Sequence, residues 1–230
     1  MSISENISRI REQISSAARR SGRKAEEITL MAVSKTFPAQ QIIEAYQAGL
    51  RVFGESKVQE FSSKAEALRD LREAEWHMIG HLQTNKAAKA VELFSAVDSL
   101  DSLRLAEKLN SVAEQFGKKL AVLIEINVGG EAAKSGIVPD SPELKNILQA
   151  AEQLQHLEIR GLMTVPPFTE DPQAARPFFR KLREIRDQRV PAVSMDMLSM
   201  GMSHDFEVAI EEGSTCVRIG TAIFGEREKP

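Results

Sequence analysis

The stretch ITLMAVSKTFP at residues 28–38 decides between the two fold classes that this sequence allows. It begins as an apolar run over residues 28–33, as expected of a buried strand, and a helical segment then follows Pro38 and stops near Gly49. An open doubly wound sheet that binds a nucleotide carries a glycine-rich turn at this point, whereas here the turn is Lys35-Thr36-Phe37-Pro38. The missing glycines favour a closed barrel.

The same alternation of apolar strand and helix continues to the C-terminus. Further strand candidates lie at residues 51–54, 76–80, 94–97, 120–128, 157–164, 195–200 and 216–220. With the first run these make eight strands, and helical stretches separate consecutive ones. Eight alternations in a chain of 230 residues predict an α/β fold, the (β/α)8 TIM barrel, with its helices outside a parallel sheet.

Helix-starting signals support this alternation. Ser2, with Glu5 three positions later, forms a capping box before an amphipathic pattern over residues 3–18, which predicts an extra N-terminal helix. Ser141 and Asp171 each precede a proline, so each is expected to cap a helix that begins at that proline. No linker or change of composition interrupts the chain, and we expect one domain over residues 1–230.

The composition bounds the classes of function. The chain has 30 Lys and Arg against 33 Asp and Glu, whereas a protein that coats nucleic acid usually carries a basic excess. Its only cysteine, Cys216, excludes an intrachain disulfide and fits a reducing cytoplasm. The longest obvious apolar run, residues 120–124, is too short to cross a bilayer, and the charged N-terminus does not resemble a signal peptide. We expect a soluble cytoplasmic protein that binds neither nucleic acid nor membrane.

Small residues cluster after the last two predicted strands. Ser199 and Gly201 lead into a helical segment at residues 205–212, and Gly220 and Thr221 close the eighth strand. In TIM barrels these two loops often bind phosphate through backbone amides and a helix N-terminus. Either loop alone is more simply read as an ordinary tight turn, but both together at this pair of strands predict a phosphate site.

Lys35 ends the first predicted strand. Side chains alternate along a strand, so Met31, Val33 and Lys35 share one face, and the amine is expected to point into the mouth of the barrel. The alternative is that the strand has already ended and the amine extends into water, as lysines usually do. A partly desolvated lysine can form a Schiff base with an aldehyde, and a phosphorylated aldehyde would use both features.

Arg218 narrows the choice of ligand. It shares a face of the eighth strand with Cys216 and Gly220, which places its guanidinium inside the barrel, below the phosphate loop. Alternatively, Arg218 pairs with a buried acid such as Glu125 or Asp196 and has only a structural role. A lysine, two phosphate loops and an interior arginine together predict pyridoxal phosphate. An arginine facing the ring nitrogen would disfavour its protonation and weaken the cofactor as an electron sink.

The four histidines do not predict a metal site. His77 and His81 are four positions apart, but along a strand this spacing spans about 13 Å, too far to share one zinc ion. We expect His77 to be packed or hydrogen-bonded inside the barrel and His81 to lie near its mouth. His156 and His204 are expected at the surface.

Motifs along the whole chain resemble those of the pyridoxal-phosphate homeostasis protein family, single-domain relatives of the alanine racemase barrel. The matching stretches are AVSKT at residues 32–36, FGE at 53–55, WHMIGHLQTNK at 76–86, KSG at 134–136, GLMT at 161–164, LSMGMS at 198–203 and VRIGTAIFG at 217–225. The chain departs from the family pattern at Ser56-Lys57, where many members carry asparagine followed by tyrosine or arginine. The pattern leaves the position of His81 open, so no role is carried over to it.

The resemblance implies a (β/α)8 barrel that holds pyridoxal 5′-phosphate as an aldimine on Lys35. It implies phosphate contacts from Ser199, Gly201, Gly220 and Thr221, with Arg218 near the ring nitrogen. It also implies a role in vitamin B6 and amino-acid homeostasis, by binding and passing on the cofactor, without established catalytic turnover. Pyridoxal-phosphate-dependent apoenzymes or a regulatory protein are the expected partners of a monomer.

Two other functions stay open. An amino-acid racemase needs an acid or base on each face of its substrate, and the sole tyrosine, Tyr46, is expected outside the barrel, which leaves His81 as a substitute. A cofactor-sensing adaptor would bind a partner through its surface helices, for example over residues 62–75, although most charged helical faces are only solvated.

Overall fold

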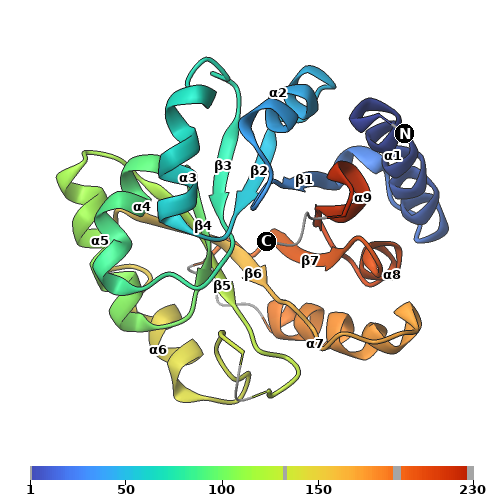
Figure 1. Cartoon of the computed structure of the whole chain (residues 1–230). Coiled ribbons are helices and arrows are strands. Elements are labelled where there is room, and N and C mark those ends of the chain that lie inside the picture. Colours follow the sequence, from blue (N-terminus) through green and yellow to red (C-terminus); the bar gives the residue numbers. More distant parts are fainter. Residues whose placement is uncertain (1, 132–133, 189–192, 227–230) are drawn as a thin grey trace.

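Eight parallel strands close into a barrel in chain order (Figure 1) in the computed structural model, which describes residues 2–131, 134–188 and 193–226. The strands are β1 (Thr29–Val33), β2 (Val52–Glu55), β3 (Glu75–Met78), β4 (Ala96–Leu100), β5 (Leu120–Glu125), β6 (Leu157–Met163), β7 (Met197–Met202) and β8 (Cys216–Ile219). The sheet closes because β1 pairs with both β2 and β8. The predicted TIM barrel is confirmed.

The helices surround the barrel (Figure 1). They are α1 (Ile3–Arg20), α2 (Ala39–Gln47), α3 (Val58–Lys64), α4 (Ala87–Leu93), α5 (Leu103–Gln115), α6 (Pro142–Ala150), α7 (Arg176–Asp187), α8 (Phe206–Glu211) and α9 (Thr221–Phe224). Short 3-10 turns are η1 (Ala25–Glu27), η2 (Ala65–Leu68), η3 (Thr84–Lys86) and η4 (Pro172–Ala175). Within the described ranges, no helix has the length and apolarity that a bilayer span requires.

The predicted helix starts are confirmed at α1 and only in part elsewhere. Glu5 N donates to Ser2 Oγ at 3.2 Å and Ser2 N donates to Glu5 Oε2 at 2.7 Å, which completes the capping box. Ser141 precedes α6, but its hydroxyl makes no capping bond and is buried without a partner. Asp171 accepts from Gln173 N, yet the segment it caps is the 3-10 turn η4, which precedes α7.

The two faces of the sheet differ in chemistry. The outward face is mainly apolar where it packs on the helices, with Ala32 of β1 and Ile219 of β8 paired and fully buried. The inward face carries Met31 and Arg218, which are paired one residue earlier in the same two strands. Alternation of side chains therefore places a buried arginine inside the barrel.

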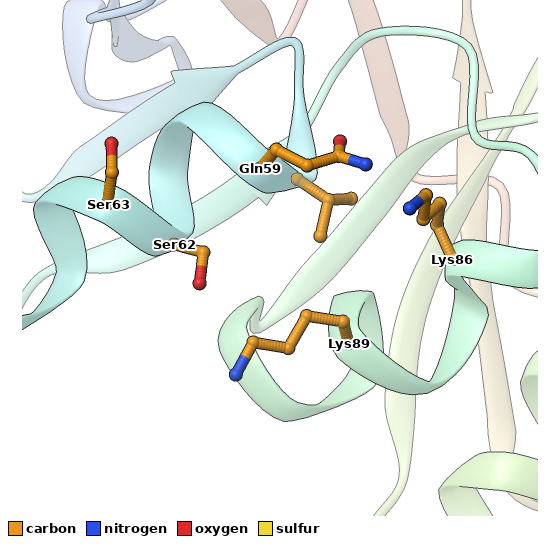
Figure 2. A pocket seen from close by; sticks show the side chains of 6 residues that line it. Gln59, Ser62, Ser63, Lys86 and Lys89 are labelled. Carbon is orange, nitrogen blue, oxygen red and sulfur yellow. The ribbon is translucent and has the colours of Figure 1, made fainter.

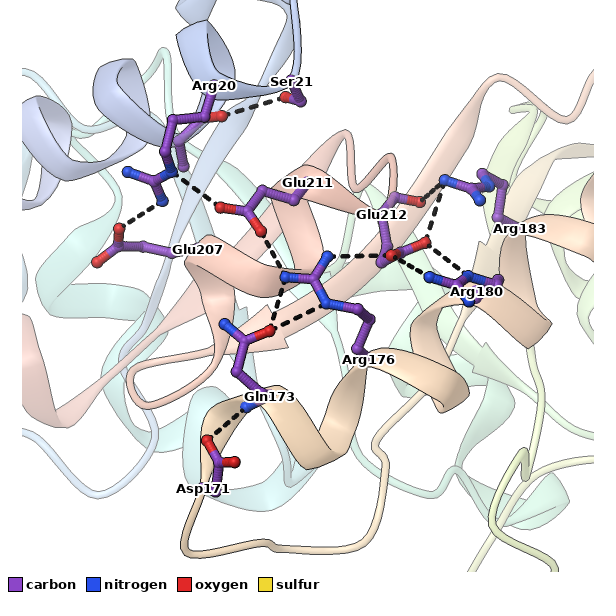
Figure 3. Close-up of polar contacts among 11 residues, drawn as sticks. Arg20, Ser21, Asp171, Gln173, Arg176, Arg180, Arg183, Glu207, Glu211 and Glu212 are labelled. Carbon is purple, nitrogen blue, oxygen red and sulfur yellow. Dashed lines mark hydrogen bonds and ion pairs between the residues drawn. The ribbon is translucent and has the colours of Figure 1, made fainter.

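Charged side chains on three outer helices form a connected network (Figure 3). Glu212, at the end of α8, accepts bonds from Arg176, Arg180 and Arg183 of α7. The network continues through Glu211 and Glu207 to Arg20 at the end of α1. Burial alone raises the pKa of Glu212, but the bonds from Arg180 and Arg176 hold it below its usual value. Helices distant in the sequence are thus joined by paired charges.

Candidate functional site

Closure of the barrel brings Lys35 to the last strand. Lys35 lies two residues beyond the end of β1, and β1 pairs with β8, which Gly220 follows. A Cβ atom at Gly220 would lie 3.3 Å from the Val33 carbonyl oxygen and 3.4 Å from Val33 Cβ. The lysine segment and the turn after β8 therefore meet at the carboxyl ends of the strands, which form the mouth of the barrel.

Arg218 lies beneath this mouth and is 4% exposed. Its Nη1 donates to Ser199 Oγ at 2.9 Å and its Nη2 donates to the Thr164 carbonyl oxygen at 2.7 Å. Among the described residues it forms no ion pair with Glu125 or Asp196, and its bonds go to neutral oxygens instead. Burial lowers the pKa of Arg218, while nearby acids oppose that effect.

The two predicted phosphate residues of β7 have packing roles of their own. Ser199 is fully buried and its hydroxyl is engaged by Arg218. Gly201 has φ +93°, and a Cβ atom there would lie 2.6 Å from Ala209 Cβ and 2.9 Å from Phe206 Cα. Glycine is therefore required for α8 to pack against β7. Phosphate contacts from these two residues stay a prediction.

The loops after β7 and β8 do lie together. Ala222 N donates to Ser203 Oγ at 3.4 Å, which links the start of α9 to the loop after β7. Gly220 is partly buried at the start of α9 and Thr221 is exposed. The sequence pattern correctly brought the ends of β7 and β8 together, but it was wrong to place Ser199 and Gly201 after the seventh strand, because both lie within β7.

The histidines are placed as predicted in the interior and at the mouth. His77 is buried on β3, and its Nδ1 lies 3.0 Å from Asp98 Oδ1. Burial lowers the pKa of His77, but Asp98 outweighs that effect and raises it to about 9. His81 follows β3, its side chain is 56% exposed, and its Nδ1 lies 2.8 Å from Asp101 Oδ2. The part of the chain that the structure describes holds no cluster of three or more candidate metal ligands.

Two buried carboxylates are functional candidates that the sequence analysis did not select. Glu125 ends β5 and accepts from Ser135 Oγ at 3.0 Å, while its Oε2 is buried without a hydrogen-bond partner. Burial raises the pKa of Glu125, and Arg218 and His81 act in the opposite direction. Glu55 of β2 is fully buried and also has an unpartnered Oε2. An acid at the end of an otherwise apolar strand is the signal that would have identified both.

A groove of about 340 Å³ lies between α3 and α4, away from the predicted cofactor contacts. Gln59 and Lys86 face each other across it (Figure 2), and the remaining lining residues are Val58, Ser62, Ser63 and Lys89. Lys89 is paired with Glu92 on its own helix at 2.7 Å. The groove contains no residue that the sequence analysis placed in the site.

Comparison with known proteins defines the family. Residues 6–228 match the family model described as alanine racemase, N-terminal domain. The chain is 48% identical over 230 residues to the pyridoxal phosphate homeostasis protein of Aquifex aeolicus, covering 99% of this chain and 100% of that protein. The protein of the same name from Escherichia coli K12 is 44% identical, with coverage of 98% and 97%.

Solved structures agree with these matches. PipY of Synechococcus elongatus with PLP bound superimposes with a TM-score of 0.84 at 37% identity, covering 97% of this chain and 100% of that one. An alanine racemase of Clostridium difficile matches with a TM-score of 0.71 at 13% identity, and the match covers 99% of this chain but 57% of the racemase. The racemase likeness concerns the fold alone.

The fold and the residues at its mouth define a barrel of the alanine racemase N-terminal type. Within that class, the chain belongs to the pyridoxal phosphate homeostasis protein family.

Proposed function

We propose that this protein binds pyridoxal 5′-phosphate at the mouth of its barrel and serves vitamin B6 and amino-acid homeostasis without catalytic turnover. The observation that carries this proposal is that the end of β1, two residues before Lys35, lies against the turn after β8, with Arg218 buried on the same strand as that turn. The PLP-bound structure of PipY, which matches over nearly the whole chain, supports it.

The residues present fit this cofactor. When bound, it would supply an aldehyde able to condense with the Lys35 amine, with the loss of one water molecule. Amides and hydroxyls after β7 and β8 would hold the phosphate. The proposed contact residues are Lys35, Ser199, Gly201, Arg218, Gly220 and Thr221.

Arg218 would disfavour proton-dependent chemistry at the cofactor ring. Its guanidinium is fixed by Ser199 and the Thr164 carbonyl and has no carboxylate pair among the described residues. A fixed cation near the ring nitrogen opposes its protonation, which weakens the ring as an electron sink. This arrangement suits a protein that stores or passes on the cofactor.

An amino-acid racemase is the second candidate, and the exposed His81–Asp101 pair at the mouth favours it. Tyr46 does not provide the second base, because it lies on α2 outside the barrel, with the Arg51 guanidinium 4.2 Å from its ring centroid. A chiral assay with alanine and serine distinguishes the two functions: we expect no racemisation by the loaded protein.

We further propose one cofactor-binding domain over residues 1–230 that is a cytoplasmic monomer, with apoenzymes or a regulatory protein as its protein partners. The buried Cys216 thiol, whose pKa burial raises to about 12, fits a reducing compartment in which it stays unreactive. Pulldown with and without cofactor, together with sedimentation, tests the partners and the monomer.

The decisive experiment is spectroscopic. Protein loaded with pyridoxal phosphate is expected to show a visible absorption band that borohydride removes, and peptide mapping should then find the reduced adduct on Lys35. An adduct on another lysine, or no adduct, would contradict the proposal.

A further inference from the structure

The residues on both sides of Lys35 are held by side chains from β2 and α3. Ser34 Oγ donates to Glu55 Oε1 at 2.8 Å, and Thr36 N donates to Glu60 Oε1 at 2.5 Å. Lys64, at the end of α3, donates to the Ser34 carbonyl oxygen at 3.3 Å. The lysine segment is therefore fixed before and after the residue that would meet the cofactor.

Lys64 also joins the two acids to each other. Its Nζ lies 2.7 Å from Glu60 Oε1 and 3.4 Å from Glu55 Oε1. The Lys64 side chain is 13% exposed and that of Glu55 is fully buried. We call Glu55, Glu60 and Lys64 the Lys64 bridge. Ion pairs this well buried lose little to solvent screening, and removal of one member leaves the others uncompensated.

The segment that the bridge holds is conformationally strained. Thr36 has φ +70°, and among the described residues it is the single non-glycine residue with a positive φ. A β-branched residue in this left-handed region is an outlier that persists only when its surroundings hold it there. The bond from Thr36 N to Glu60 is such a restraint.

We propose that Glu55, Glu60 and Lys64 are positioning residues that hold the strained 34–36 segment so that the Lys35 amine is presented to the aldehyde. This inference rests on the proposed function of Lys35. The bridge touches the chain on either side of Lys35 and acts through it, so its loss should affect the formation of the covalent link more than the grip on the phosphate.

The test compares Lys64→Met with a matched control, Lys89→Met, which breaks the Lys89–Glu92 pair on α4. The measurement is the rate at which pyridoxal phosphate, and separately pyridoxal without phosphate, forms the borohydride-trapped adduct on Lys35 across pH. We expect Lys64→Met to slow both aldehydes equally, about tenfold, and to change the pH profile, because charged hydrogen bonds of this kind contribute about that factor. Lys89→Met should leave both rates unchanged.

Three further substitutions keep the inference falsifiable if Lys64→Met folds poorly. Lys64→Arg retains the cation and should restore most of the rate, and Glu60→Gln should slow it to an intermediate degree. Thr36→Gly removes the strain, so Lys64→Met should have a smaller effect in that background. If wild type is trapped at Lys35 but Lys64→Met reacts at the same rate with the same pH profile, the inference is wrong. If wild type itself gives no Lys35 adduct, the proposed function fails instead.

Discussion

The outer network on α1, α7 and α8 and the inner face of the barrel are both rich in charge, but their charges are partnered differently. In the outer network, Glu212 accepts from three arginines, and Arg20 bonds to two glutamates. Inside the barrel, Arg218 bonds only to neutral oxygens among the described residues, and Glu125 has one oxygen without a partner.

This difference suggests that the outer network serves stability and that the inner face serves ligand binding. Paired charges at a surface join helices, whereas incompletely partnered buried charges disfavour folding unless a ligand or a second role compensates. We therefore expect the incompletely partnered charges of Arg218 and Glu125 to lower stability and the outer network to raise it. Substitutions in the two regions should therefore have opposite signatures in ligand binding and in stability.

The largest expected effect is that of Lys35→Ala, which should abolish the visible band of the loaded protein, because the substitution removes the amine to which the cofactor is proposed to be linked. Absorption spectra before and after borohydride measure this. Lys89→Ala, on the outside of the barrel, is the control and should retain the full band. A band of unchanged intensity in Lys35→Ala would move the linkage to another residue.

Next comes Glu212→Gln in the outer network. Its carboxylate is 5% exposed and bonded to three arginines, so we expect the free energy of unfolding to fall by about 2 kcal/mol, as for hydrogen bonds between charged groups. Urea titration measures the change. Cofactor affinity should stay the same. A large loss of affinity would contradict the expectation that the outer network affects stability and not binding.

For Glu125→Gln we expect a smaller change in the free energy of unfolding, and an increase instead of a decrease. Burial raises the pKa of Glu125 in the folded state, so stability falls as pH rises from the ordinary carboxyl value of about 4.3 through the raised folded value. The variant should be more stable than wild type at pH 7 and equal to it below about pH 4. Urea titrations at the two pH values check this, and equal stability at pH 7 would show that the carboxylate is compensated.

The smallest effect is expected for Arg20→Met. The Arg20 side chain is 49% exposed, so its pairs with Glu207 and Glu211 are screened by water and salt. The free energy of unfolding should fall by under about 1 kcal/mol, and the difference should disappear in high salt. A loss as large as that of Glu212→Gln would show that this exposed pair is not weakened by solvent as expected.

The sequence predicted that the strands exist but not where each of them begins and ends. The fifth strand was predicted over residues 120–128 but is Leu120–Glu125, because Ile126 forms only an isolated bridge with Ile137 and Val128 is buried beyond the end of the strand. The seventh was predicted over residues 195–200 but is Met197–Met202, since Gly201 lies inside an irregular stretch of pairing and not in the loop. A run of apolar residues indicates which residues are buried, and burial can continue beyond the last paired residue of a strand.

The candidate site divides in the same way. Alternation along β8 correctly placed Arg218 inside the barrel, and the order of the strands correctly brought the loops after β7 and β8 together. The sequence pattern could not predict the hydrogen bonds of Arg218, because their acceptors lie 19 and 54 positions away in the chain. Nor could it predict that Gly201 packs against α8, which explains the glycine at this position without a phosphate ligand.

The sequence by itself determined the eightfold alternation of strand and helix and the inward face of the eighth strand, because these follow from backbone periodicity. Only the tertiary structure decided that Lys64 fastens the segment around Lys35, and that Glu125 keeps an unpartnered oxygen beneath the mouth. Such contacts depend on the register at which the barrel closes, and register is a property of all eight strands together.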